Sequence, residues 1–230
     1  SLTYRVDYAS DSVSSAARSQ EQFGVATVGT QDYGWWGGGA YHWPNGGVRM
    51  REAIYKLTYA NDTAASMGYI DIDMSGPTYS PVGVCDSVMC AIGIQDKNYG
   101  WYIGGCYGQG LNSPYYDYED RLLNASMMVR HDFSNDTTTV YSSSVLARGT
   151  ANGAGTSDGT YGYIIGGAPV PDFHTNPGGI LNGGGWNSSV QRISLSNLTV
   201  YGDFKGTLGG SKGWQSAWNA QDACNYAHST

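Results

Sequence analysis

The sequence predicts an all-β fold built from repeated four-stranded units, and three features indicate it. A segment with an apolar anchor, a turn and a hydroxyl residue occurs four times, anchored at Tyr8, Tyr59, Phe133 and Leu195. The anchor spacing varies, as between supersecondary units joined by loops of different length. A second segment, which ends at a glycine pair, alternates with the first. The chain also has 34 glycines and 19 tyrosines, and only 13% charged residues, which suits short strands and tight turns.

Each complete unit contains four predicted strands, which we name a to d in chain order. In the first unit, strand a is predicted at residues 21–30 and strand b at residues 33–36. Residues 53–59 alternate as expected for strand c. Asn61-Asp62 forms the turn into strand d, around residues 67–72, because Asn and Asp side chains can bond the backbone two residues on.

The glycine-pair segment marks strand b. Three copies join a short aromatic or β-branched strand to two glycines, and a degenerate fourth copy keeps an acid and a tyrosine without the glycines. The copies are residues 32–38, 99–105, 161–167 and 221–228.

The two ends of the chain complement each other. The chain begins with strands c and d, at residues 4–8 and from residue 13, and finishes with strands a and b, at residues 213–220 and 224–229. Joining these halves gives a single domain, residues 1–230, folded as a four-bladed β-propeller. Closure would remove exposed strand edges. The alternatives are a segment of a longer propeller, and half-units that pair between molecules.

A cation precedes each anchor by three residues, at Arg5, Lys56, Arg130 and Arg192. A ring of four cations around a ligand is one interpretation. We favour the other, in which each cation pairs across strands within its own unit, because a feature present in every unit is better explained by construction than by one binding site. The predicted acidic partners open strand b and are Asp32, Asp96, Asp158 and Asp222.

The alternation of these segments resembles kelch-like repeats. It is closer to tandem repeats of tail-fibre and other virion-associated proteins of marine bacteriophages, particularly cyanophages, and it spans nearly the whole chain. The resemblance implies a non-catalytic surface or adhesion role, although propellers host many functions. The sequence departs from those repeats in its long loops and in its fourth strand b. The segments that carry the resemblance are residues 5–8, 99–102, 130–137, 161–167 and 192–197.

The loops between strands b and c hold the candidate binding residues. Equivalent loops of a propeller emerge on one face, so their aromatic side chains are expected to cluster there. Large rigid side chains suit contact with a glycan or a protein. Two alternatives remain: the aromatics cap the blade ends, or they drive self-assembly into a fibre or lattice. The candidates are Tyr41, His42, Trp43, Tyr107, Tyr115, Tyr116, Phe173, His174 and Trp186.

Catalysis has little support in the sequence. Asp117, Glu119 and Asp120 lie close together and could serve a glycan-processing enzyme, but such groups are usually solvated loop charges. No motif for a metal, a cofactor or a nucleophile is found. A net charge of −7 disfavours nucleic acid as a partner, and no apolar stretch is long enough for membrane insertion.

Cysteines and glycosylation signals leave alternatives open. The four cysteines allow three disulfide pairings or none, and five sequons occur, three of them at the repeated turn. The chain starts at Ser1, so a leader was removed or the chain belongs to a longer protein. We therefore predict an extracellular or virion-surface structural and adhesion module, as a homo-oligomer or part of a larger assembly. The cysteines are Cys85, Cys90, Cys106 and Cys224, and the sequons are Asn61, Asn124, Asn135, Asn187 and Asn197.

Overall fold

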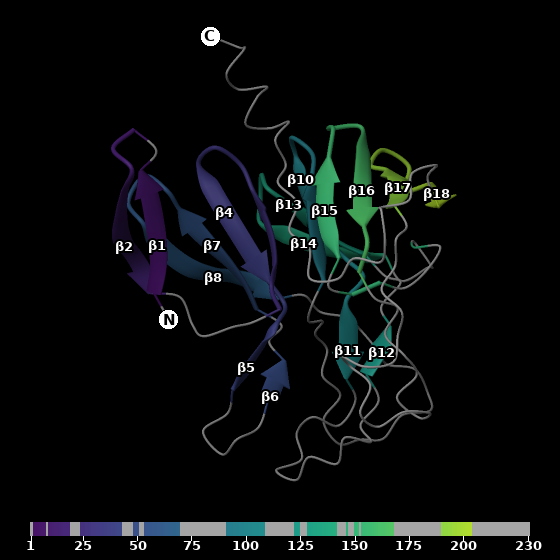
Figure 1. The fold of residues 1–230 in the computed structure, drawn as a ribbon, viewed down its shortest axis with the longest axis horizontal. Helices are drawn as coiled ribbons and strands as arrows, with labels where there is room; N and C mark the ends of the chain where they lie inside the picture. Colours follow the sequence, from purple (N-terminus) through teal and green to yellow (C-terminus); the bar gives the residue numbers. More distant parts are fainter. Residues whose placement is uncertain are drawn as a thin grey trace.

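The protein is all-β in the part described by a computed structural model, which contains strands and no helix (Figure 1). No described segment forms a helix long and apolar enough to cross a membrane. The described residues are 2–7, 9–18, 24–42, 48–50, 53–69, 91–108, 122–124, 128–141, 146, 150–151, 153–167 and 190–203.

Three sheets each contain four antiparallel strands in the order a-b-c-d, as the sequence predicts. We call them units 2, 3 and 4. Strand d of unit 2 begins at Thr63, earlier than expected. Unit 2 is formed by β3 (Ala26–Gly29), β4 (Tyr33–Gly37), β7 (Ala53–Thr58) and β8 (Thr63–Tyr69). Unit 3 is formed by β9 (Ile92–Gln95), β10 (Tyr99–Ile103), β13 (Met128–Asp132) and β14 (Thr137–Tyr141). Unit 4 is formed by β15 (Ala154–Ser157), β16 (Tyr161–Ile165), β17 (Val190–Ser194) and β18 (Val200–Asp203).

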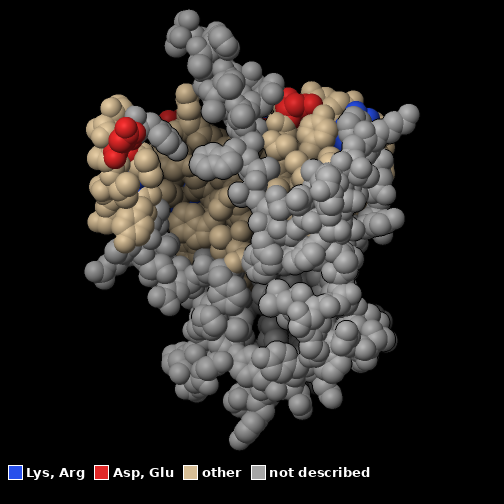
Figure 2. Space-filling view, in the orientation of Figure 1, with Lys and Arg blue, Asp and Glu red and all other residues tan. Residues whose placement is uncertain are grey.

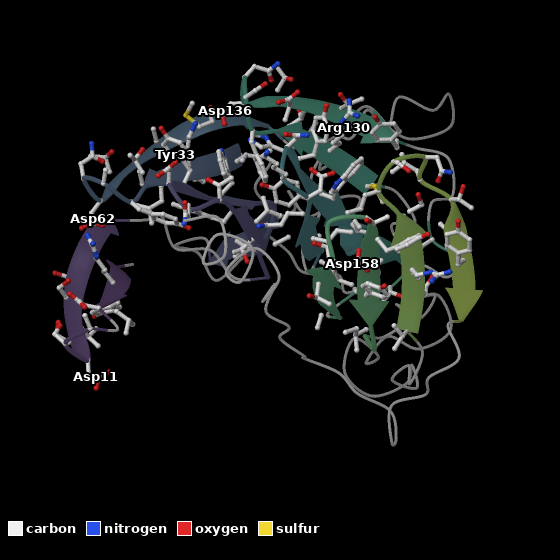
Figure 3. All side chains as sticks on the ribbon, turned by 90° about the horizontal axis from the view of Figure 1, so that it is seen from above. Asp11, Tyr33, Asp62, Arg130, Asp136 and Asp158 are labelled. Atoms are coloured by element: carbon white, nitrogen blue, oxygen red, sulfur yellow. The ribbon has the colours of Figure 1, made fainter. Side chains whose placement is uncertain are left out.

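Unit 1 is the antiparallel hairpin of β1 (Leu2–Asp7) and β2 (Ser12–Arg18). These strands match the predicted c and d of the first half-unit, and β2 contacts β8 of unit 2. The predicted partners at residues 213–220 and 224–229 lie outside the described residues. Figure 3 shows the units following one another along an arc, with the hairpin β1–β2 and strand β18 at its two ends.

The strands a of units 2, 3 and 4 lie innermost, and their backbones touch. A Cβ atom added to Gly93 of β9 would collide with the carbonyl oxygen of Thr27 in β3, and one added to Gly155 of β15 would collide with the carbonyl oxygen of Gly93. Only glycine permits this approach. A side chain also links these strands, because the Gln95 amide accepts a hydrogen bond from the Gly29 N–H and donates one to the Gly29 carbonyl oxygen. The inner strands therefore fix the distance between units.

All four c–d turns have the same backbone conformation. Their fourth residue has a positive φ of 50° to 58° in every copy, although it is never glycine; these residues are Asp11, Asp62, Asp136 and Leu198. In units 2 and 3, the Asn before it accepts a hydrogen bond from the Thr after it, at 2.7 Å from Thr63 Oγ1 to Asn61 Oδ1 and from Thr137 Oγ1 to Asn135 Oδ1. The predicted role of Asn in this turn is confirmed.

The glycine pairs differ from the prediction in unit 2. Both residues of each pair have positive φ, and in unit 2 these are Gly38 and Gly39 rather than Gly37 and Gly38. Gly37 belongs to β4. The pairs of units 3 and 4 lie where the sequence predicts them, at residues 104–105 and 166–167.

Neighbouring units pack face to face, and two apolar cores result. The first core joins Trp35 and Ile54 of unit 2 to Tyr102 and Val129 of unit 3. The second core joins Trp101, Ile103 and Met128 of unit 3 to Ile164 and Ile193 of unit 4. We call the face with Trp35, or Trp101, the front of a unit and the opposite face its back, so each described core packs one front on the next back.

Candidate functional site

The two described b–c connections project from the same end of the array. One contains the hairpin of β5 (Ala40–His42) and β6 (Val48–Met50), and the other that of β11 (Cys106–Gly108) and β12 (Leu122–Asn124). Both lie below the main sheets in Figure 1, whereas the c–d turns lie at the other end. Figure 2 shows acidic groups along the upper edge, away from these hairpins.

Three predicted binding residues lie in these hairpins. Tyr41 and His42 belong to β5, and Tyr107 belongs to β11; their backbones are described but their side chains are not. The other candidates lie outside the described residues: Trp43, Tyr115, Tyr116, Phe173, His174 and Trp186.

The candidate glycosylation sites, cysteines and acidic residues also lie partly within and partly outside the described residues. Asn61, Asn135 and Asn197 lie exposed in the c–d turns, where their side chains stabilise the turn. Asn124 and Cys106 lie on β12 and β11, with their side chains not described. Outside the described residues are Cys85, Cys90, Cys224, Asn187, Asp117, Glu119 and Asp120.

The densest polar cluster of the described residues lies between units 2 and 3, around Asp136. Its Oδ2 accepts a hydrogen bond from Lys56 Nζ at 2.8 Å, and its Oδ1 accepts one from Trp35 Nε1 at 2.8 Å. His131 Nε2 lies 3.2 Å from Oδ1. Lys56 and Trp35 come from unit 2, whereas His131 and Asp136 come from unit 3. We call these four residues the Asp136 cluster.

Burial and pairing set the charges in the Asp136 cluster. Burial would raise the pKa of Asp136, but hydrogen bonds from Lys56, Trp35 and His131 outweigh it and hold that pKa below its ordinary value. Burial lowers the pKa of His131, against the opposing effect of Asp136. The imidazole is therefore neutral near pH 7, with its proton on Nε2, the nitrogen that faces Asp136.

The Asp136 cluster has the perturbed pKa values that often mark functional sites, but its geometry indicates an interunit joint. Both carboxylate oxygens are engaged by neighbours, and His131 is fully buried. Among the described residues, no group of three or more His, Cys, Asp or Glu is placed to hold a metal.

The prediction of ion pairs within each unit is wrong for Lys56, because Lys56 pairs with Asp136 of the next unit. Arg5 likewise reaches Asp62 of the next unit, at 3.4 Å. Asp96 and Asp158 instead stabilise the a–b turns, where their Oδ1 atoms accept backbone N–H groups at 2.7–2.9 Å.

Asp32 does not occupy the position in its a–b turn that Asp96 and Asp158 occupy in theirs. In unit 2 the turn position belongs to Thr30, whose Oγ1 accepts the Tyr33 N–H at 3.2 Å. The fourth predicted acid, Asp222, lies outside the described residues.

The repeated cation of each of units 2 to 4 lies over the tyrosine that opens strand b of its own unit. The distances to the ring centroids are 4.2 Å for Lys56 and Tyr33, 4.6 Å for Arg130 and Tyr99, and 4.6 Å for Arg192 and Tyr161. Such cation–π contacts stabilise by roughly 0.5–1 kcal/mol at exposed sites. A cation three residues before the anchor, together with an acid three residues after it, is the sequence signal from which the interunit contact could have been found.

Comparisons with known proteins assign no family. No family model and no curated protein matches this sequence. A solved structure of YjhT is similar over 94% of this chain and 80% of its own, with a TM-score of 0.45 and 11% sequence identity. The sheets of the described residues form a propeller-like array of four-stranded antiparallel units.

Proposed function

We propose that this protein is a non-catalytic adhesion and structural module, a closed four-bladed propeller that binds a glycan or a protein through its b–c loops. The observation that carries this proposal is the division of the molecule into two ends. The c–d turns repeat one conformation and join the units, whereas the b–c connections are long, differ from one another and are rich in aromatic residues.

Closure is part of the proposal. Unit 1 has two described strands where the other units have four, and the sequence predicts the missing strands a and b at residues 213–220 and 224–229. Pairing them beside β1 would complete the fourth blade and remove the strand edges at the ends of the array. Closed blades would direct all b–c loops toward one face.

The surroundings of the module are proposed from the resemblance to bacteriophage tail-fibre repeats. That resemblance favours an extracellular or virion-surface location and assembly with further copies or other fibre subunits. A rigid β scaffold with variable loops is a common way of presenting a binding surface.

Glycan-array binding by the full chain tests the adhesion role. Replacing Trp43 and Trp186 by alanine is expected to abolish binding, because aromatic stacking on sugar rings needs both the area and the face of the indole. The control is Tyr201→Ala, which removes an exposed aromatic from the outer strand β18. Binding that survives the double substitution would remove these loops from the proposal.

The alternative assignments give different results. A self-assembling subunit of a fibre or lattice would retain glycan binding after the Trp43 and Trp186 substitutions but would fail to polymerise. A glycan-processing enzyme would hydrolyse a polysaccharide and lose that activity when Asp117, Glu119 and Asp120 are all replaced by their amides.

A further inference from the structure

Strand β1 of unit 1 has an open edge in the described part of the chain. Strands β7, β13 and β17 hold the same place in units 2 to 4, and each pairs with a strand b on one side and a strand d on the other. Among the described residues, β1 pairs only with β2. The described side chains of β1, from Tyr4 to Asp7, are all exposed, and a two-stranded hairpin alone is marginally stable in water. A strand b therefore belongs beside β1.

The register of unit 1 shows which residues of β1 would face this strand. The β1–β2 pair closes with Asp7 opposite Ser12, and the equivalent residues close the c–d pairs of units 2 and 3. Arg5 therefore occupies the position of Lys56 in unit 2, and Val6 occupies that of Leu57.

A tyrosine from strand b lies beneath the repeated cation in each of units 2 to 4, at 4.2–4.6 Å from cation to ring centroid. This tyrosine is followed by a glycine and then by a second aromatic residue. The same spacing of tyrosine and aromatic ring recurs at residues 226–228, within the predicted strand b of unit 1, with alanine in place of glycine. The four segments are Tyr33-Gly34-Trp35, Tyr99-Gly100-Trp101, Tyr161-Gly162-Tyr163 and Tyr226-Ala227-His228.

We infer that residues 226–228 form strand b of unit 1 in the same molecule, with Tyr226 stacked on Arg5 and Ala227 paired with Val6. This inference rests on the proposed closure and fixes the register of the strand pair that completes unit 1. The equivalent residues of unit 2 make the same cation–π contact and the same backbone pair. Residues 204–230 follow β18 and are enough for two strands of four or five residues, the lengths found in unit 3.

The register also assigns a position to His228. It takes the place of Trp35, whose indole donates a hydrogen bond to Asp136. An imidazole ring is smaller than an indole and shields less of its surroundings, so the Arg5–Asp62 pair stays open to solvent. The Arg5 side chain is 57% exposed, in agreement with this assignment.

Disulfide scanning on the full chain measures the register. Val6→Cys is combined with one C-terminal cysteine at a time in a Cys224→Ser background, and the bond is identified by mass spectrometry of the oxidised monomer. Directly opposed residues of antiparallel strands have Cα atoms about 4.5–5.5 Å apart, within disulfide range. Ala227→Cys should bond roughly fivefold more than its two neighbours, whose side chains point to the other face. The scanned substitutions are Asn225→Cys, Tyr226→Cys, Ala227→Cys, His228→Cys and Ser229→Cys.

A double-substitution cycle tests the stacking of Tyr226 on Arg5. Arg5→Met and Tyr226→Leu each remove one partner of the cation–π contact, so the combined fall in melting temperature should be smaller than the sum of the single falls by roughly 1–4 °C. The matched control combines Arg5→Met with Tyr201→Leu, which removes an exposed tyrosine from β18 at the other end of the array. These two losses should add, because the sites are far apart.

The pattern of bonding separates this inference from closure itself. Bonding that is strongest at another of the five positions in a monomer, or additive losses for Arg5→Met and Tyr226→Leu, would overturn the assignment and leave closure standing. Absence of a bond at all five positions would overturn both. A bond found only between molecules would show that copies exchange strands, which also overturns both.

Discussion

The joint between units 2 and 3 and the joint between units 3 and 4 use the same four backbone positions, but three of the four side chains differ. In the first joint, His131 and Asp136 of unit 3 meet Lys56 and Trp35 of unit 2. In the second joint, the positions of His131 and Asp136 are occupied by Ile193 and Leu198, and the positions of Lys56 and Trp35 by Arg130 and Trp101.

The side chains at the second joint are less favourable in two respects. Trp101 Nε1 is buried and has no hydrogen-bond partner among the described residues, whereas its equivalent in the first joint bonds Asp136. A buried donor without a partner costs about 1–3 kcal/mol. Leu198 also has a φ of 58°, which is unfavourable for a branched side chain. Backbone geometry therefore defines the joint, and either polar or apolar side chains can fill it.

The largest effect is expected from Asp136→Asn. Asparagine keeps the shape and tolerates positive φ, but it leaves Lys56, whose side chain is 17% exposed, without its counter-charge. Breaking such a pair should lower the free energy of unfolding by about 3 kcal/mol, measured by urea denaturation. The matched control is Asp62→Asn at the same turn position. Equal losses at the two sites would contradict the view that the Asp136 cluster is the stronger joint.

The pH dependence of stability should report His131. Burial lowers its folded pKa below the ordinary 6.5, so the unfolded chain binds more protons between the two values. Stability should therefore fall as the pH drops from 6.5 toward the folded pKa, with a slope of at most about 1.4 kcal/mol per pH unit. His131→Ile, which copies Ile193, should flatten this part of the profile in thermal melts. Parallel profiles for the two proteins would mean that His131 does not titrate in this way.

Leu198→Asp should convert the second joint toward the first. The carboxylate would be placed to accept a hydrogen bond from Trp101 Nε1 and to pair with Arg130, and it would relieve the positive φ. We expect a gain of about 1 kcal/mol. Leu198→Asn relieves the backbone without adding charge and is the control. If the two variants are equally stable, or if Arg130→Met leaves their difference unchanged, the joints are not interchangeable.

The features that the sequence predicts well are local. Strand alternation and the Asn61 turn depend on neighbouring residues, so the a-b-c-d order of units 2 to 4 and the turn bonds were predictable. The partner of Lys56 was not, because Asp136 belongs to another unit and only spatial order brings them together. The glycine pair of unit 2 was misplaced because three consecutive glycines, Gly37 to Gly39, permit two alignments that only φ distinguishes.

The smallest effect is expected from Asp62→Asn, which removes the ion pair with Arg5. The two side chains are 57% and 35% exposed, so water and salt screen their attraction, and such pairs contribute roughly 0–1 kcal/mol. The loss should therefore stay below about 1 kcal/mol and vanish at 1 M salt, where the Debye length is about 3 Å. The loss for Asp136→Asn should persist at that salt concentration, because the Asp136 cluster is mostly shielded from solvent. A salt-insensitive loss at Asp62 would show that unit 1 is joined to unit 2 as tightly as unit 2 is to unit 3.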